Sequence, residues 1–246
     1  MLHPDPQDEQ GHDQQGHDLM RRTAAVILSL LSAAALWVPG LAKAEAPSTL
    51  DADEALKLLL AGNQRFVEGN LKSVTRDEMA QRRAELVQGQ KPFAIVLCCS
   101  DSRVGPEIVF DQELGNLFVV RTAGEVLDAA AIGTIEYGVV HLGSSLLLVL
   151  GHEQCGAVAA AVADAREPGH IGSIVKAIRP AVARTKDEPS DALQNAVRAN
   201  VQNIAVQLRS TGPVLSKAAQ AGRLKVTGAV CSLKTGKVEL VPDESK

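Results

Sequence analysis

Short apolar runs alternate with amphipathic stretches along the chain after about residue 90. Four runs have the length of a strand and an apolar content that favours burial on both faces. They are Phe93–Cys98, Leu117–Val120, Ser145–Leu150 and Leu224–Val230. Helical patterns lie between them at 129–141, 156–165 and 191–209. Strands that alternate with helices predict right-handed crossovers and an α/β fold, with a mostly parallel sheet of four to five strands flanked by helices.

Further elements are predicted at both ends of this α/β region. Ser48 or Thr49 can cap a helix that runs towards Phe66, and a second amphipathic helix is expected at about 76–87. Residues 232–241 contain a Lys-Thr-Gly-Lys turn between two extended stretches, so they predict a small hairpin after the last strand.

The first 44 residues have the pattern of a targeting segment. Arg21 and Arg22 precede an uncharged apolar run, and Ala-Lys-Ala at 42–44 has the small-x-small spacing of a signal-peptidase site. The apolar run is shorter than the ~20 residues that a membrane span needs. We therefore expect a mis-assigned or disordered extension at 1–19, a signal peptide at 20–44 and one folded domain at 45–246. An uncleaved membrane anchor is the alternative.

A signal peptide implies a periplasmic or secreted protein, exported by a Sec-type route, with a twin-arginine route as the alternative. We expect no stable membrane association after cleavage. Apolar residues make up 46% of the chain, which is enough for a sizeable core, and the net charge is only −4. Because no basic stripe is interleaved with aromatic residues, we expect no nucleic-acid partner.

Two short motifs follow two of the predicted strands. Cys-Ser-Asp-Ser-Arg occupies 99–103, directly after the first strand, and His-Glu-Gln-Cys occupies 152–155, directly after the third. Ligands of open parallel sheets bind beyond the carboxyl ends of the strands, so neighbouring strands would bring Cys99, His152 and Cys155 together. This donor set suits Zn²⁺, and three protein ligands with a free fourth place are typical of a catalytic site.

Asp101 and Arg103 add a second element to this site. Asp101 is two residues from Cys99, close enough to occupy the fourth place on the metal. Arg103 can hold that carboxylate away by a bidentate contact and free it to accept a hydrogen bond from zinc-bound hydroxide. A structural zinc site is less favoured because it normally has four Cys or His ligands. A buried His–Cys pair without metal is the simplest alternative.

Taken together, the two motifs, at 99–104 and 151–156, resemble those of the β-class carbonic anhydrases. The resemblance covers nearly all of the predicted domain, from about Asp51 to Val241. It implies one Zn²⁺ per chain on the three candidate ligands, with Asp101 and Arg103 beside it. It also implies reversible hydration of carbon dioxide to bicarbonate and a proton by zinc-bound hydroxide, in a homodimer or higher even oligomer.

Four further positions match substrate-pocket residues of that family: Gln90, Phe118, Tyr137 and Gly156. The resemblance implies that a neighbouring subunit supplies some of them, although the two rings could also be core residues. Some members of the family are inhibited by bicarbonate at a site with a Trp three residues before the first ligand. Val96 at that position favours the open, water-bound form without this inhibition.

Three other functions are compatible with parts of this pattern. Relatives of the same fold hydrolyse carbonyl sulfide or carbon disulfide with the same ligands, and the motifs do not separate these substrates. A non-enzymatic zinc- or bicarbonate-binding protein is a second alternative. A dithiol redox role for Cys98 and Cys99 is disfavoured because redox pairs normally have the C-x-x-C spacing. We expect Cys98 and Cys231 to be buried free thiols.

The predicted cleavage site can be tested by mass spectrometry of the mature protein. We expect an N-terminus at Glu45, because the small residues Ala42 and Ala44 fit the peptidase. A mature chain that still contains residues 20–44 would contradict the prediction.

Overall fold

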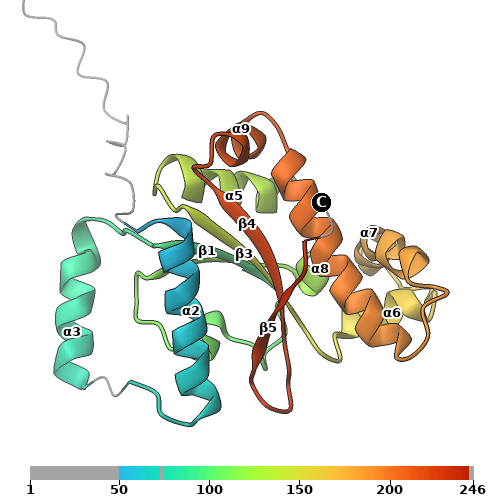
Figure 1. Cartoon of the computed structure of the whole chain (residues 1–246), viewed down its shortest axis with the longest axis horizontal. Helices are drawn as coiled ribbons and strands as arrows, with labels where there is room; N and C mark the ends of the chain where they lie inside the picture. The colour runs from blue at the N-terminus through green and yellow to red at the C-terminus, as the bar shows by residue number, and fades with distance from the viewer. Residues whose placement is uncertain (1–49, 73–74, 244–246) are drawn as a thin grey trace, which may run out of the picture. The chain divides into compact units, whose positions relative to one another are not determined.

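A five-stranded sheet lies at the centre of the domain, with strand order β2-β1-β3-β4-β5 (Figure 1). The computed structural model describes residues 50–72 and 75–243. The strands are β1 Ala94–Cys98, β2 Leu117–Arg121, β3 Leu146–His152, β4 Lys225–Cys231 and β5 Val238–Val241. β1 to β4 are parallel and β5 is antiparallel to β4, so the predicted fold class is confirmed. The predicted hairpin at 232–241 is only partly right, because its first arm is β4 itself and only β5 follows the turn.

The helices agree with the sequence pattern in most places. They are α2 Ala52–Val67, α3 Arg76–Glu85, α4 Pro106–Val109, α5 Ala129–Val140, α6 Gly156–Val162, α7 Ile171–Arg184, α8 Ala192–Ser210 and α9 Val214–Gln220, with 3-10 turns η1 Leu86–Gln88 and η2 Ala123–Glu125. The prediction that Ser48 or Thr49 caps α2 is wrong. Asp51 caps it, because its carboxylate accepts the backbone N–H groups of Asp53 and Glu54.

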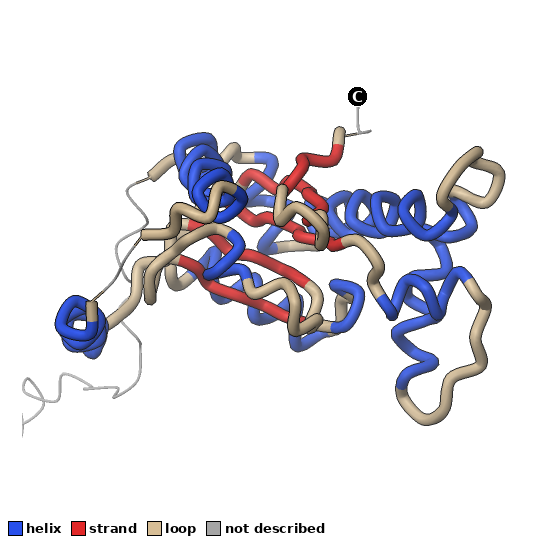
Figure 2. Tube along the Cα trace, turned by 90° about the horizontal axis from the view of Figure 1, so that it is seen from below, coloured by secondary structure: helices blue, strands red, loops and turns tan. Residues whose placement is uncertain are grey.

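Helices cover both faces of the sheet (Figure 2). The face that carries Val96 and Cys98 packs against α2 and α4. The other face, with Ile95 and Leu97, packs against the helices α5 to α9. The sheet therefore separates two cores, and successive residues of β1 alternate between them.

Close contact between α8 and the sheet depends on two glycines. A Cβ at Gly151 would lie 2.5 Å from a methyl of Val201, and a Cβ at Gly228 would lie 2.6 Å from the other. Both distances are too short for a side chain, so only glycine lets α8 pack this closely against β3 and β4. This contact holds α8 next to the strand that ends at His152.

The N-terminal predictions fall outside the described part of the chain. The expected extension at 1–19 and signal peptide at 20–44 lie there, and the described part of the predicted domain begins at residue 50. Among the described residues, no helix combines the length and the apolar character that crossing a membrane requires.

Candidate metal centre

The three predicted ligands converge at the carboxyl edge of the sheet. β1 and β3 are neighbours, with Cys98 opposite Leu150, so Cys99 and His152 leave the sheet side by side. Cys155 follows a turn in which Gln154 has a left-handed backbone with φ of 52°. Cys155 is also the N-cap residue of α6. The two Sγ atoms and a ring nitrogen lie within 4.8 Å of one another, and all three residues are buried.

His152 is oriented for metal binding by its second ring nitrogen. Nδ1 lies 2.8 Å from the Glu153 carbonyl oxygen, which can only accept, so Nδ1 carries the proton. Nε2 is therefore the atom with a free lone pair, and it is buried with no hydrogen-bond partner among the described residues. This is the arrangement that metal-binding histidines show, with the outer nitrogen fixed by a backbone carbonyl.

The two cysteines of the cluster have very different proton affinities when no metal is bound. The pKa of the Cys99 thiol is lowered, chiefly by a hydrogen bond from the Cys155 thiol, and the Gly124 N–H adds to the effect. The pKa of Cys155 is raised, because its proton is held between the two sulfurs. Burial lowers the pKa of His152, but its contacts with Cys99 and Glu153 outweigh this and leave the pKa raised. The cluster thus favours one negative charge shared by the two sulfurs.

These residues fit a zinc ion. Tetrahedral zinc with sulfur and imidazole ligands needs donor atoms roughly 3.5–3.8 Å apart, which the 4.8 Å limit allows with small adjustments. The unpartnered Nε2 of His152 and the ready thiolate of Cys99 would both be satisfied by such an ion.

Asp101 and Arg103 form the bidentate pair that the sequence predicts. Oδ1 of Asp101 accepts hydrogen bonds from the backbone N and from Nε of Arg103, both at 2.9 Å, and Oδ2 accepts one from Nη2 at 2.7 Å. The Arg103 guanidinium holds the pKa of the Asp101 carboxyl far below its usual range. Oδ2 lies 3.8 Å from Nε2 of His152, so the carboxylate borders the ligand cluster.

Two charged residues that the sequence analysis did not single out for this role hold the ligand-bearing loops. Arg121 at the end of β2 donates from Nε to the Cys99 carbonyl at 2.9 Å and from Nη2 to the Asp101 carbonyl at 2.7 Å. Glu153 accepts hydrogen bonds from Ser232 Oγ at 2.9 Å and from the backbone N of Leu233 at 3.0 Å. Arg121 therefore ties the loop after β1 to β2. Glu153 ties the loop after β3 to the residues that follow β4.

A third support lies behind Cys99, in the turn η2. The backbone N of Gly124 donates a hydrogen bond to Cys99 Sγ at 3.3 Å. Asn200 of α8 donates from Nδ2 to the Gly124 carbonyl at 2.9 Å. Burial, followed by the negative charge of Cys99, raises the pKa of the neighbouring Glu125 well above its usual value. None of these contacts has a local sequence signal, because Asn200 is 76 residues from Gly124.

Only one of the four predicted pocket residues lies next to the ligands within this chain. Gly156 follows Cys155 and borders open space. Phe118 pairs with Ile95, four residues before Cys99, which is roughly 13 Å along the strand. Tyr137 stacks on Phe118 with ring centroids 6.1 Å apart. The exposed Gln90 precedes β1, at the amino ends of the parallel strands, whereas the ligands lie at their carboxyl ends.

Comparisons with known proteins agree with this geometry. The family model for carbonic anhydrase matches residues 94–238. Carbonic anhydrase 2 of Mycobacterium tuberculosis is 38% identical over 190 residues, which cover 76% of this chain and 91% of that protein. The structure of the β-carbonic anhydrase CcaA matches with a TM-score of 0.60 and 25% identity, over 75% of this chain and 94% of that one. Coccomyxa β-carbonic anhydrase, solved in complex with acetazolamide, matches with a TM-score of 0.61 and 25% identity, over 76% and 86%.

The metal site predicts different outcomes for two adjacent cysteines. Cys99→Ala should lose most of its zinc, because it removes one of three ligands. Cys98→Ala should retain about one zinc per chain, because Cys98 is buried in the other core. Elemental analysis after dialysis against a weak chelator measures both. Full zinc occupancy in Cys99→Ala would contradict the assignment.

Proposed function

We propose that this chain, which belongs to the β class of the carbonic anhydrase family, catalyses the reversible hydration of carbon dioxide to bicarbonate and a proton. The observation that carries the proposal is the bidentate Asp101–Arg103 pair beside a cluster of three protein ligands. Cys99, His152 and Cys155 would hold the zinc ion. Zinc, when bound, acidifies water and stabilises negative charge that develops on oxygen.

Asp101 is the residue that orients the reacting water. Its Oδ1 is saturated by two donors from Arg103, whereas Oδ2 has one donor and faces the ligand cluster. Because the pKa of Asp101 is far below its usual range, the carboxylate stays ionised and can only accept hydrogen bonds. A water at the site therefore donates its hydrogen to Oδ2 and presents a lone pair to carbon dioxide.

Arg103 has a separate task, which is to keep Asp101 from binding the metal itself. Both carboxylate oxygens are held by the guanidinium, and Nη2 also lies 3.4 Å from the Gln154 carbonyl in the second ligand loop. The side chain thus spans both ligand loops. The planar guanidinium binds both oxygens of a carboxylate at once, whereas a lysine ammonium would bind as a single point charge.

A second copy of the chain completes the site in this proposal. Phe118, Tyr137 and Gln90 lie too far from their own ligands to line the pocket, so a neighbouring subunit would have to bring them there. Tyr137 and Val140 of α5 are 45% and 54% exposed, next to the edge strand β2. An exposed apolar strip at a sheet edge is typical of a subunit interface.

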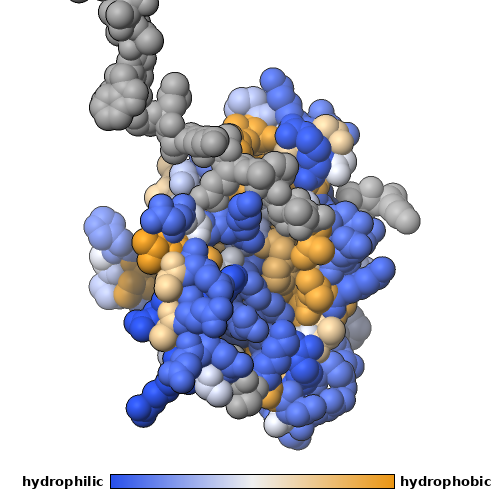
Figure 3. Space-filling view, turned by 90° about the vertical axis from the view of Figure 1, so that its left-hand side faces the viewer, coloured by the Kyte–Doolittle hydropathy of each residue, from blue (hydrophilic) through white to orange (hydrophobic). Residues whose placement is uncertain are grey.

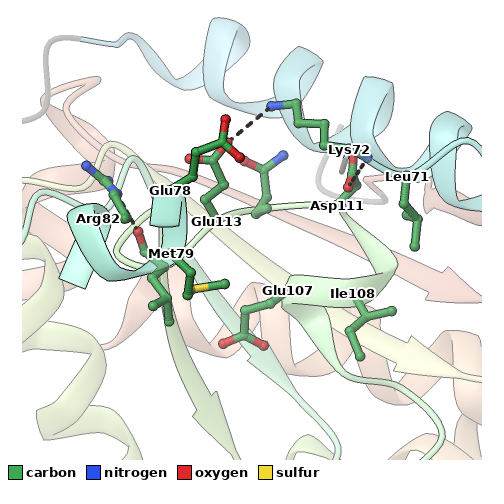
Figure 4. A pocket seen from close by; sticks show the side chains of 11 residues that line it. Leu71, Lys72, Glu78, Met79, Arg82, Glu107, Ile108, Asp111 and Glu113 are labelled. Atoms are coloured by element: carbon green, nitrogen blue, oxygen red, sulfur yellow. Dashed lines mark hydrogen bonds and ion pairs between the residues drawn. The ribbon is translucent and has the colours of Figure 1, made fainter. Parts of the chain in front are cut away.

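The helix α3 supports the same conclusion. It has no buried residue and stands away from the sheet, with apolar side chains exposed on this side of the domain (Figure 3). Between α3 and α4 lies a hollow of about 720 Å³ that Leu71, Met79, Ile108 and Leu114 help to line (Figure 4). We infer that a second copy fills this hollow in a homodimer or higher even oligomer.

The catalytic role of Asp101 is tested with an isosteric variant. Asp101→Asn should keep its zinc and lose about 100-fold or more of its activity, the range expected for a group that manages a proton in the reaction. Stopped-flow measurement of carbon dioxide hydration, with zinc analysis of the same sample, gives both quantities. Asp164→Asn is the matched control, because Asp164 forms a 2.7 Å pair with Arg179 outside the ligand cluster.

Two outcomes would overturn the proposal. One is an Asp101→Asn protein with full zinc and undiminished hydration activity. The other is a wild-type protein that hydrolyses carbonyl sulfide or carbon disulfide faster than it hydrates carbon dioxide, which would assign the site to those substrates.

The dimer is tested at the exposed strip of α5. Val140→Glu should shift the protein to the monomer and reduce activity without loss of zinc, because a buried unpaired charge opposes association. Sedimentation velocity measures the mass, and Val206→Glu on α8 is the control, since Val206 is 47% exposed. A fully active wild-type monomer would contradict the prediction.

A further inference from the structure

We propose that Asn200 of α8 is a positioning residue for the metal ligand Cys99, on which it acts through the Gly124 backbone. The proposal rests on the metal site of the proposed function, but not on the identity of the substrate. Asn200 lies outside both ligand loops and contacts none of the three ligands through an observed hydrogen bond. Its effect on the site must therefore pass through the turn η2.

The contacts form a short chain from the helix to the sulfur. Nδ2 of Asn200 donates to the Gly124 carbonyl at 2.9 Å and lies 3.4 Å from Oε2 of Glu125. The backbone N of Gly124 donates to Cys99 Sγ at 3.3 Å, within the usual range for a bond to sulfur. Asn200 is only 3% exposed, and Gly124 and Glu125 are also buried. Solvent cannot replace the amide in this role.

The turn that presents the Gly124 N–H needs such external support. Gly124 and Glu125 both have left-handed backbones, with φ of 65° and 54°, and the second is costly for a residue with a side chain. No residue with a side chain fits at position 124, because a Cβ there would lie 2.7 Å from Ile178 and 3.2 Å from Ala157. Asn200 offsets part of this strain by pairing the carbonyl between the two residues.

An N–H hydrogen bond to a thiolate draws charge from the sulfur. Two thiolates and a neutral imidazole cancel the charge of Zn²⁺, and such a centre acidifies water less than one with neutral ligands. By holding Gly124 against Cys99, Asn200 would make that sulfur a weaker donor and restore part of the acidity. It would also fix the position of the ligand. Both effects are typical of residues that contact metal ligands from outside.

Two asparagines of α8 provide a matched pair for the test. Asn200→Leu removes the donor and keeps the branched shape of the side chain. Asn195→Leu is the control, because Nδ2 of Asn195 is buried but has no hydrogen-bond partner among the described residues. We would measure zinc affinity by competition with a chromogenic chelator, and the sulfur-to-metal charge-transfer band of the Co²⁺-substituted protein.

We expect Asn200→Leu to bind zinc about 10- to 100-fold more weakly than the wild type, because the loss of a fixed position for Cys99 outweighs the stronger donation of its sulfur. Its Co²⁺ charge-transfer band should move to longer wavelength, because a thiolate without the N–H bond gives up charge more easily. Asn195→Leu should change neither quantity. The band separates positioning from a general loss of stability, which would lower the unfolding midpoint and leave the band in place.

An affinity within twofold of the wild type and an unshifted band in Asn200→Leu would overturn the inference and leave the proposed function intact. A wild-type protein without zinc affinity would overturn both. If Asn200→Leu does not fold, Asn200→Ser is used, whose hydroxyl is too short to reach the Gly124 carbonyl. It should shift the band in the same direction, and an unshifted band would again overturn the inference.

Discussion

Negative charge on buried sulfur is the constraint around which this domain is organised. A thiolate in an apolar core is costly unless a cation or hydrogen-bond donors compensate it. Cys99 and Cys155 lie in the larger core, among aliphatic side chains of the sheet and helices. The compensation comes from the Gly124 N–H, from the second thiol and, on the proposed function, from zinc. The remaining charged groups fix the loops that carry the sulfurs.

Much of this could be predicted from the sequence, since the signals involved are local. Strand-length apolar runs predicted β1 to β4, and two motifs directly after β1 and β3 predicted the ligand cluster. α7 was not predicted, because Pro180 lies inside it and interrupts the helical pattern. The supports behind the ligands were also missed. Arg121 and Asn200 donate to backbone carbonyls that lie 20 or more residues away in the sequence. No spacing rule predicts such contacts.

On the proposed function, a second copy of the chain would explain the place of two groups in the described domain. The rings of Phe118 and Tyr137 stack at the edge of the sheet, where one of them is largely exposed. α3 contributes no buried side chain to the core, although its capping box shows that its own end is well formed. The exposed Tyr137 and a helix without buried side chains are understandable if their stabilisation comes from association.

Cys98, at the end of β1, and Cys99, directly after it, lie on opposite faces of the sheet. Cys98 belongs to the core under α2, where burial raises its pKa, whereas the pKa of Cys99 is lowered on the opposite side by the Cys155 thiol. Moving β1 by one residue against β3 would bring Cys98 to the face of the ligand cluster and turn Cys99 to the other face, because side chains alternate between faces. A misregistered chain would then offer the metal a sulfur from the wrong core. On the proposed function, zinc would add its binding free energy to the register that places Cys99 beside His152 and Cys155.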